Sequence, residues 1–336
     1  MGHGVRFRNR GVYPYSRAVK RAVAPSAEVR RRLDRIRALR GDEVRLRELA
    51  LEILPNEGNP ELLAAALRAL SAGVRSEDHG VLIDLYEHLD GDGKRRDVGG
   101  AVRVEVLNVL WRLRNADDRD LAFHAATTRE VSLMGNGAMI RAAGLALLGV
   151  LDPPAATMIA AEMLGSGDAD RMTAQPALTA ANLLAAEGEF AALALYAHAF
   201  MRSGPAEVVA ECLRALVAVP ASQLATLLKD FVESGDEVRL LGLCDFIVGH
   251  PPDPMTAGLA LKVFGLREQD EIYAYLATAT VASRREDLLA AFLTSLKTET
   301  NRLRLKIASQ ALELAAPSAA VSEARSALAK TLGSPP

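Results

Sequence analysis

The sequence predicts an all-α protein that is a long array of packed helices. Half of its 336 residues are apolar but only 4% are aromatic, and alanine and leucine dominate the apolar set. This composition favours helices, because strands are enriched in β-branched and aromatic residues. Apolar residues also recur at helical spacing in segments of about 12 to 18 residues, and one short motif opens several of these segments.

Residues 1–25 differ in composition from the rest of the chain. They contain several glycines and prolines, among them Gly11, Pro14 and Pro25, and no apolar stripe at helical spacing. Such a sequence is typical of extended, flexible chain. We therefore divide the chain into a basic N-terminal arm, residues 1–25, and a helical body, residues 26–336.

Residues 26–40 predict the first helix. Val29, Leu33 and Ile36 recur at helical spacing, Ser26 can cap the first turn, and Gly41 ends the segment. The opposite face of this helix is almost wholly arginine.

Helical segments of similar length then alternate with short breaks up to the C-terminus. Three of the breaks place Asn or Asp before a proline, at 59–60, 152–153 and 253–254, which is typical of a helix start because proline suits the first turn. The predicted segments are 42–54, 60–72, 77–90, 99–114, 117–131, 137–151, 153–165, 172–187, 189–202, 205–219, 221–234, 236–249, 254–266, 268–281, 284–296, 299–315 and 317–332.

An internal repeat runs through these segments. The hexapeptide Gly-Asp-Glu-Val-Arg-Leu occurs at residues 41–46 and again at 235–240, and related segments begin near residues 102, 140, 208 and 303. The separations between these starts correspond to one or two units of about 29 to 38 residues. We interpret each unit as a pair of helices that buries its apolar face against the next pair.

Residues 140–149, Ile-Arg-Ala-Ala-Gly-Leu-Ala-Leu-Leu-Gly, resemble the second helix of a HEAT repeat. The resemblance extends in weaker form over most of residues 42–332. It implies an α-solenoid of antiparallel helix pairs, here about 17 to 18 helices, that binds extended partners along its concave surface. The segment 172–187, with Gln175-Pro176, departs from the pattern and leaves the repeat phase there open. The repeated arginines, Arg141 among them, are interpreted as scaffolding between units.

Charge is distributed unevenly along the chain. Residues 1–40 carry twelve basic and two acidic residues, a net charge of +10, so the remaining residues carry −12. Cations and aromatic rings alternate in the arm, which favours either nucleic acid or an acidic protein, including another copy of this chain, as its partner. The candidate binding residues are Arg6, Phe7, Arg8, Arg10, Tyr13, Tyr15, Arg17, Lys20, Arg21, Arg30, Arg31, Arg32 and Arg35.

Motifs for chemistry are not found in the sequence. The six histidines show no metal-ligand spacing, and no nucleophile elbow is present, so we predict no catalytic residue, no metal and no cofactor. Cys212 and Cys244 lie in apolar helical patterns and are predicted to be buried thiols in a reducing compartment. No apolar run is long enough for a membrane span. We expect a cytoplasmic protein, and the alanine- and arginine-rich composition suggests a bacterial one.

Some HEAT-like proteins are DNA glycosylases that use tryptophan, aspartate and arginine on the concave face. The only tryptophan, Trp111, has Arg112, Arg114, Asp117 and Asp118 nearby. We interpret Trp111 as a packing residue, because it occupies the position of the repeat's glycine. The sequence therefore favours a non-enzymatic scaffold with a protein partner; the alternatives are a nucleic-acid-binding protein and, less favoured, a glycosylase. The oligomeric state stays open.

Overall fold

The computed structural model describes residues 26–91, 96–130 and 137–333. Within these ranges the chain forms eighteen α-helices and four short 3₁₀ helices, and no strand beyond one isolated bridge between Ala169 and Pro176. The prediction of an all-α protein is confirmed. The arm lies outside the described residues.

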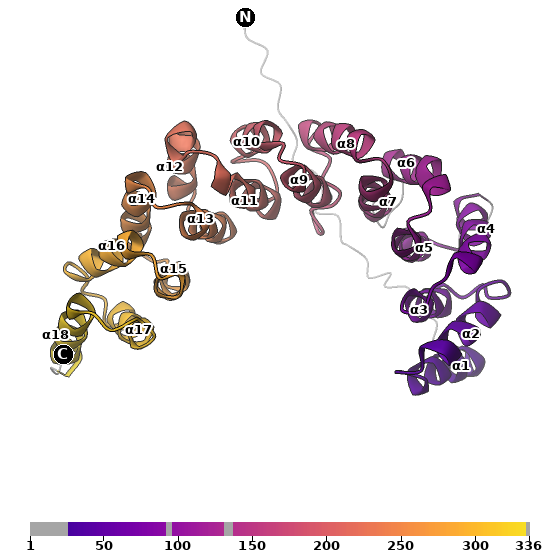
Figure 1. Cartoon of the computed structure of the whole chain (residues 1–336), viewed down its shortest axis with the longest axis horizontal. Coiled ribbons are helices and arrows are strands. Elements are labelled where there is room, and N and C mark those ends of the chain that lie inside the picture. The colour runs from indigo at the N-terminus through magenta and orange to yellow at the C-terminus, as the bar shows by residue number, and fades with distance from the viewer. Residues whose placement is uncertain (1–25, 92–95, 131–136, 334–336) are drawn as a thin grey trace, which may run out of the picture.

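The helices form an arch with an inner and an outer row (Figure 1). Odd-numbered helices from α3 onwards line the inner side, even-numbered helices line the outer side, and α1 packs against α3 at one end. The inner helices are α3 (Pro60–Ser71), α5 (Ala101–Leu113), α7 (Ala138–Leu151), α9 (Ala177–Ala186), α11 (Ala206–Ala215), α13 (Glu237–Gly249), α15 (Asp270–Ser283) and α17 (Arg302–Glu313). The other helices are α1 (Ala27–Ala38), α2 (Glu43–Ile53), α4 (His79–Asp90), α6 (Arg119–Thr127), α8 (Pro153–Gly165), α10 (Phe190–Ala199), α12 (Ala225–Glu233), α14 (Pro254–Phe264), α16 (Glu286–Leu296) and α18 (Ala319–Gly333).

Side-chain caps begin the helices where the sequence predicts them. The Ser26 hydroxyl accepts a hydrogen bond from the Val29 amide at 3.2 Å and starts α1. Asn59, Asp152 and Asp253 each accept amide hydrogen bonds from the first turn of the helix that begins at the following proline. These side chains satisfy N–H groups that have no partner inside the helix.

The repeated hexapeptide opens a helix at both of its positions, but the two helices belong to different rows. Residues 41–46 lead into α2, in the outer row, whereas residues 235–240 lead into α13, in the inner row. The other motif starts, near residues 102, 140, 208 and 303, all open inner helices. The predicted unit that begins at residue 44 is therefore out of phase with the rest.

The predicted helix 172–187 is wrong at its start, because α9 begins at Ala177. The Asp170 carboxylate accepts hydrogen bonds from the Met172 amide at 2.9 Å and the Thr173 amide at 3.0 Å, which folds the preceding residues into a turn. These amide bonds lower the pKa of Asp170. The side chain competes with the helix for backbone donors, so the helix starts after Pro176.

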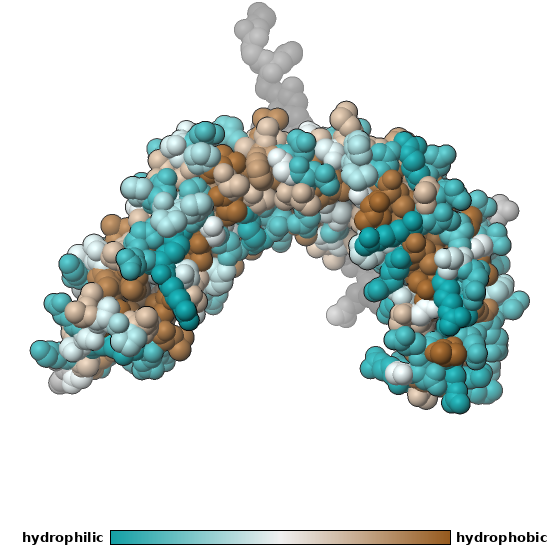
Figure 2. Space-filling model, viewed as in Figure 1, coloured by the Kyte–Doolittle hydropathy of each residue, from teal (hydrophilic) through white to brown (hydrophobic). Residues whose placement is uncertain are grey.

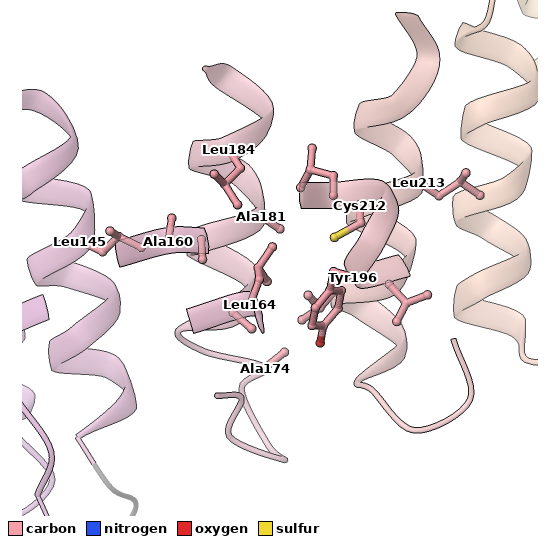
Figure 3. Packing of buried hydrophobic residues seen from close by; sticks show 14 of the residues in the cluster. Leu145, Ala160, Leu164, Ala174, Ala181, Leu184, Tyr196, Cys212 and Leu213 are labelled. Carbon is pink, nitrogen blue, oxygen red and sulfur yellow. The ribbon is translucent and has the colours of Figure 1, made fainter. Parts of the chain in front are cut away.

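One continuous apolar core fills the space between and along the two rows. Figure 3 shows Ala181 and Leu184 of α9 in this core, with Leu145 of α7 to one side and Leu213 of α11 to the other. Each inner helix thus packs against its inner neighbours as well as against the outer row. Stacking along the array buries apolar faces that a single pair of helices would leave exposed.

Both cysteines are fully buried, as the sequence predicts. Burial raises the pKa of the Cys212 and Cys244 thiols to about 12. The thiolate is the reactive form, so iodoacetamide is expected to leave the folded protein unlabelled at pH 8 and to label both residues in denaturant. Rapid labelling of the native protein, detected by mass spectrometry, would show that α11 and α13 open locally.

The outer surface is mainly polar. Figure 2 shows hydrophilic residues over much of the visible face, with hydrophobic patches on both limbs of the arch. None of the helices in the described ranges combines the length and the apolar composition that a membrane span requires.

Candidate binding surface

The sequence-predicted binding residues divide between two regions. Nine of them belong to the arm, outside the described residues. Arg30, Arg31, Arg32 and Arg35 lie on α1 at the end of the arch, where all but the half-buried Arg32 are exposed. Arg32 forms ion pairs with Glu28 of its own helix and with the Glu57 carboxylate at 3.4 Å, so it ties α1 to the loop before α3. The other three present a cationic face to solvent.

Three arginines of the repeat motif are buried and bond neighbouring segments, whereas Arg45 is exposed. Arg141 is 2% exposed, and its guanidinium donates to the Asp168 carboxylate at 2.9 Å and to the Thr128 carbonyl oxygen at 3.2 Å. Asp168 follows the outer helix α8, so the pair ties α7 to the loop between α8 and α9. The burial of Arg141 and its pairing with a carboxylate agree with its interpretation as a scaffolding residue. Arg103 and Arg304 are buried in the same manner.

The residues near the tryptophan have separate roles. Trp111 is 38% exposed and carries the Arg114 guanidinium 5.3 Å from its ring centroid, so the prediction of a packing residue is wrong. The Asp118 carboxylate is buried and bonds the His79 ring at 2.6 Å, which places it between the starts of α4 and α6. Asp118 thus links two outer helices, whereas Trp111 belongs to inner helix α5.

Each inner helix has one face whose side chains stay exposed or half-buried, because the outer row and the neighbouring inner helices cover its other sides. We call these faces together the inner face. Its members are exposed or half-buried and recur at helical spacing. They are Glu61, Ala65 and Arg68 on α3; Glu105, Asn108, Trp111 and Arg112 on α5; Met139, Ala143, Ala146 and Val150 on α7; Leu178, Asn182 and Ala186 on α9; Glu207, Glu211 and Arg214 on α11; Val238, Leu241, Asp245 and Val248 on α13; Glu271, Tyr275, Thr278 and Ala282 on α15; and Leu303, Lys306 and Gln310 on α17.

The centre of the inner face is uncharged. Helix α7 contains a single ionisable residue, the buried Arg141, and α9 contains none. Met139 and Val150, at the two ends of α7, are 43% and 36% exposed, with Ala146 exposed between them. The sequence signal for this feature is the almost complete lack of charge in residues 138–151 and 177–186. The apolar pattern alone does not show which of these residues stay exposed, so it does not predict the feature.

The flanks of the inner face are charged, and two of their arginines, Arg68 and Arg214, are paired with carboxylates. On the α3 side, Arg68 lies 3.2 Å from the Glu105 carboxylate. On the other side, Arg214 forms an ion pair with Asp245 at 2.8 Å and another with Glu211. Carboxylates thus neutralise two of the cations that a nucleic acid backbone would require.

Helices α13 and α15 also carry carboxylates. The Tyr275 hydroxyl donates to the Asp245 carboxylate, and this hydrogen bond, together with burial, raises the pKa of Tyr275 to about 12. Glu237 and Glu271 approach each other at the starts of the two helices, and their hydrogen bond and mutual repulsion raise the pKa of Glu237. This side of the inner face is therefore acidic.

A cavity of about 440 Å³ lies away from the inner face, between α4 and the loop that joins α2 to α3. Glu57, Asp84 and His88 contribute to its lining. The Glu57 carboxylate accepts hydrogen bonds from the Gly58 and Asn59 amides at 2.8 and 2.7 Å, so it stabilises the loop itself. Asp84 and His88 are exposed.

The chain matches no protein-family model, and comparisons with curated proteins and with solved structures found no similar chain. We therefore infer its function from the inner face and from the charge of the arm.

Proposed function

We propose that this chain is a HEAT-like α-solenoid of antiparallel helix pairs that binds a protein partner along its inner face and joins it to a larger assembly. The uncharged centre on α7 and α9 carries the proposal. Exposed apolar side chains that lie together and are bordered by polar residues are typical of protein contact sites. Rigid helices present Met139, Ala146 and Val150 in a line, which suits an extended or helical segment of a partner.

Burial of Arg141 supports the HEAT-like assignment. Arg141 follows the first apolar residue of the motif, as in the HEAT pattern, and it ties α7 to the loop after α8 through Asp168. Gly144, three residues later in the same motif, packs against the backbone of Ala125 and Ala126 in α6. Both residues therefore act between helices, as the repeat interpretation requires.

Charge favours a protein over nucleic acid as the occupant of the inner face. Nucleic acid binding depends on lysine and arginine side chains that neutralise phosphates. Two inner-face arginines, Arg68 and Arg214, are instead paired with carboxylates, and α7 and α9 carry no exposed charge, whereas Arg112 on α5 is exposed. The nucleic-acid alternative, including a glycosylase, rests on the arm and on the arginines of α1.

The arm and α1 give the scaffold a second, electrostatic binding element. The arm has six cations and no acid, and Arg30, Arg31 and Arg35 continue this charge on α1. Such a surface increases the rate of encounter with an anionic partner and makes binding sensitive to salt. The buried, unpaired Cys212 and Cys244 support a cytoplasmic setting for this assembly.

Site-specific photo-crosslinking in the producing cells tests the proposal. A photoreactive phenylalanine replaces Ala146, at the centre of the inner face, or Leu195, which is 70% exposed on the outer helix α10. We expect discrete protein adducts from position 146 and few from position 195, identified by mass spectrometry. Substituting Val150→Glu in the first protein should abolish its adducts, because a charge would enter the apolar contact.

Two results would contradict the proposal. The first is nuclease-sensitive adducts at position 146, which would assign the inner face to nucleic acid. The second is the same protein adducts from both positions, which would indicate non-specific contact.

A further inference from the structure

We propose that the arm of the same chain docks on the inner face when no partner is bound, and covers the uncharged centre on α7 and α9 together with the adjacent α5. This inference rests on the proposed function, because it makes the protein-binding surface self-occluded. The observations that support it are the reach of the arm, the charge of the inner face and its exposed apolar side chains.

The arm is long enough to reach this surface. Twenty-five residues precede Ser26, the cap of α1. At about 3.3 Å per residue an extended chain of that length spans roughly 80 Å. Packed helices lie about 10 Å apart, so the four steps along the inner row from α1 through α3, α5 and α7 to α9 cover only about 40 Å. The arm can cross the centre of the inner face with residues to spare.

The positive charge of the arm is complementary to carboxylates on either side of the centre of the inner face. The arm carries six cations and no acid, whereas Glu61 and Glu207 are exposed on the inner face on either side of its centre. Because the arm belongs to the same chain, its local concentration at these carboxylates is high, on the order of millimolar for a tethered segment. Weak individual ion pairs are sufficient to hold a tethered segment.

The apolar groups also match. Phe7, Tyr13 and Tyr15 lie between the cations of the arm. The α7 stripe offers them contacts along Met139 to Val150, and aromatic rings gain free energy when such contacts exclude water. Trp111, on the neighbouring helix, already holds the Arg114 guanidinium over its ring, and its exposed edge is open to an arginine or a ring of the arm.

Self-occlusion makes partner binding a displacement reaction. A partner must compete with the arm for the apolar centre. The apparent affinity of the partner is therefore its intrinsic affinity multiplied by the fraction of molecules in which the centre is open. Displacement in turn releases six cations for contact with an anionic surface of the assembly. The inner face and the arm would then act in sequence.

Photo-crosslinking within the full-length protein tests this contact. A photoreactive phenylalanine replaces Tyr13, and the purified chain is irradiated at low concentration without any partner. We expect crosslinks to peptides of α5, α7 and α9, with a yield that does not change on dilution, because the contact is within one molecule. The yield should fall in about 1 M salt, where the Debye length is roughly 3 Å.

Two lysine variants of the crosslinking protein provide the decisive comparison. Ala146→Lys puts a cation in the uncharged centre and should remove the crosslinks to α7. Met158→Lys adds the same charge on outer helix α8, where Met158 is 74% exposed, and should leave them unchanged. Crosslinks that map to the outer row, that vanish on dilution or that persist in Ala146→Lys would overturn the inference.

Quenching of the single tryptophan gives an independent readout. Acrylamide should quench Trp111 more strongly when Phe7, Tyr13 and Tyr15 are all replaced by serine, because the docked arm no longer shields the ring. Unchanged quenching would count against docking near α5. Failure of these measurements with continued partner crosslinking at position 146 would remove the self-occlusion and leave the proposed function standing. Arm docking without any partner adducts at position 146 would support the self-occlusion and contradict the proposed function.

Discussion

Replacing Arg103 with methionine is expected to lower the free energy of unfolding by about 3–5 kcal/mol, the range for breaking a buried ion pair by removing one partner. Arg103 is 0% exposed. Its guanidinium bonds the Asp97 carboxylate at 3.1 Å, the Glu130 carboxylate at 2.5 and 3.0 Å, and the Asp90 carboxylate at 2.9 Å. Methionine fills a similar volume but leaves these carboxylates without their cation. Urea denaturation followed by circular dichroism measures the change.

Arg45 provides the matched control for this substitution. It stands in the same kind of motif, yet its side chain is 71% exposed and its ion pair with Asp42 is a surface contact at 3.4 Å. Arg45→Met should therefore change stability by less than about 1 kcal/mol. Equal losses in the two variants would show that the buried charge cluster around Arg103 is not what stabilises the stack.

The substitution Gly144→Ala should destabilise the protein by about 2–3 kcal/mol, although alanine has the higher helix propensity. A Cβ atom at Gly144 would lie 2.5 Å from the Ala126 nitrogen and 2.7 Å from the Ala125 carbonyl carbon. Both contacts are with the backbone of α6, which cannot move aside as a flexible side chain can. Helices α6 and α7 would have to separate, which loses packing along the whole pair.

The same substitution at Gly258 should have the opposite sign. Gly258 lies within α14, and a Cβ atom there meets nothing within 4 Å. Gly258→Ala should raise the free energy of unfolding by about 0.5–1 kcal/mol, because alanine loses less backbone entropy in a helix. Thermal melts of the two variants measured side by side check the contrast, and a shift in the same direction for both would refute the close approach of α6 and α7.

Local signals in the sequence were sufficient to find the helices. Ser26, Asn59, Asp152 and Asp253 cap helices where we predicted starts, because a cap depends on only a few neighbouring residues. The start of α9 was missed for the same physical reason. There Asp170 folds its own turn, a local alternative that the apolar periodicity of residues 172–187 conceals.

The candidate binding surface depended more on tertiary structure. The arginine-rich face of α1 could be predicted, since helical spacing places its cations on one side. The uncharged centre could not, because an apolar stripe has the same pattern whether a neighbouring helix covers it or not. Trp111 illustrates the difference: its repeat position suggested packing, yet it is exposed.

The duplicated hexapeptide separates what the sequence determines from what the tertiary structure determines. By itself the sequence determined that each copy starts a helix: Asp42 accepts a hydrogen bond from the Arg45 amide at 3.1 Å, and Asp236 accepts one from the Arg239 amide at 2.9 Å. Only the tertiary structure decided the row of each helix, and with it the exposure of the arginine, 71% for Arg45 against 13% for Arg239. Capping acts within one turn of chain, whereas burial depends on helices that lie about 30 or more residues away in sequence.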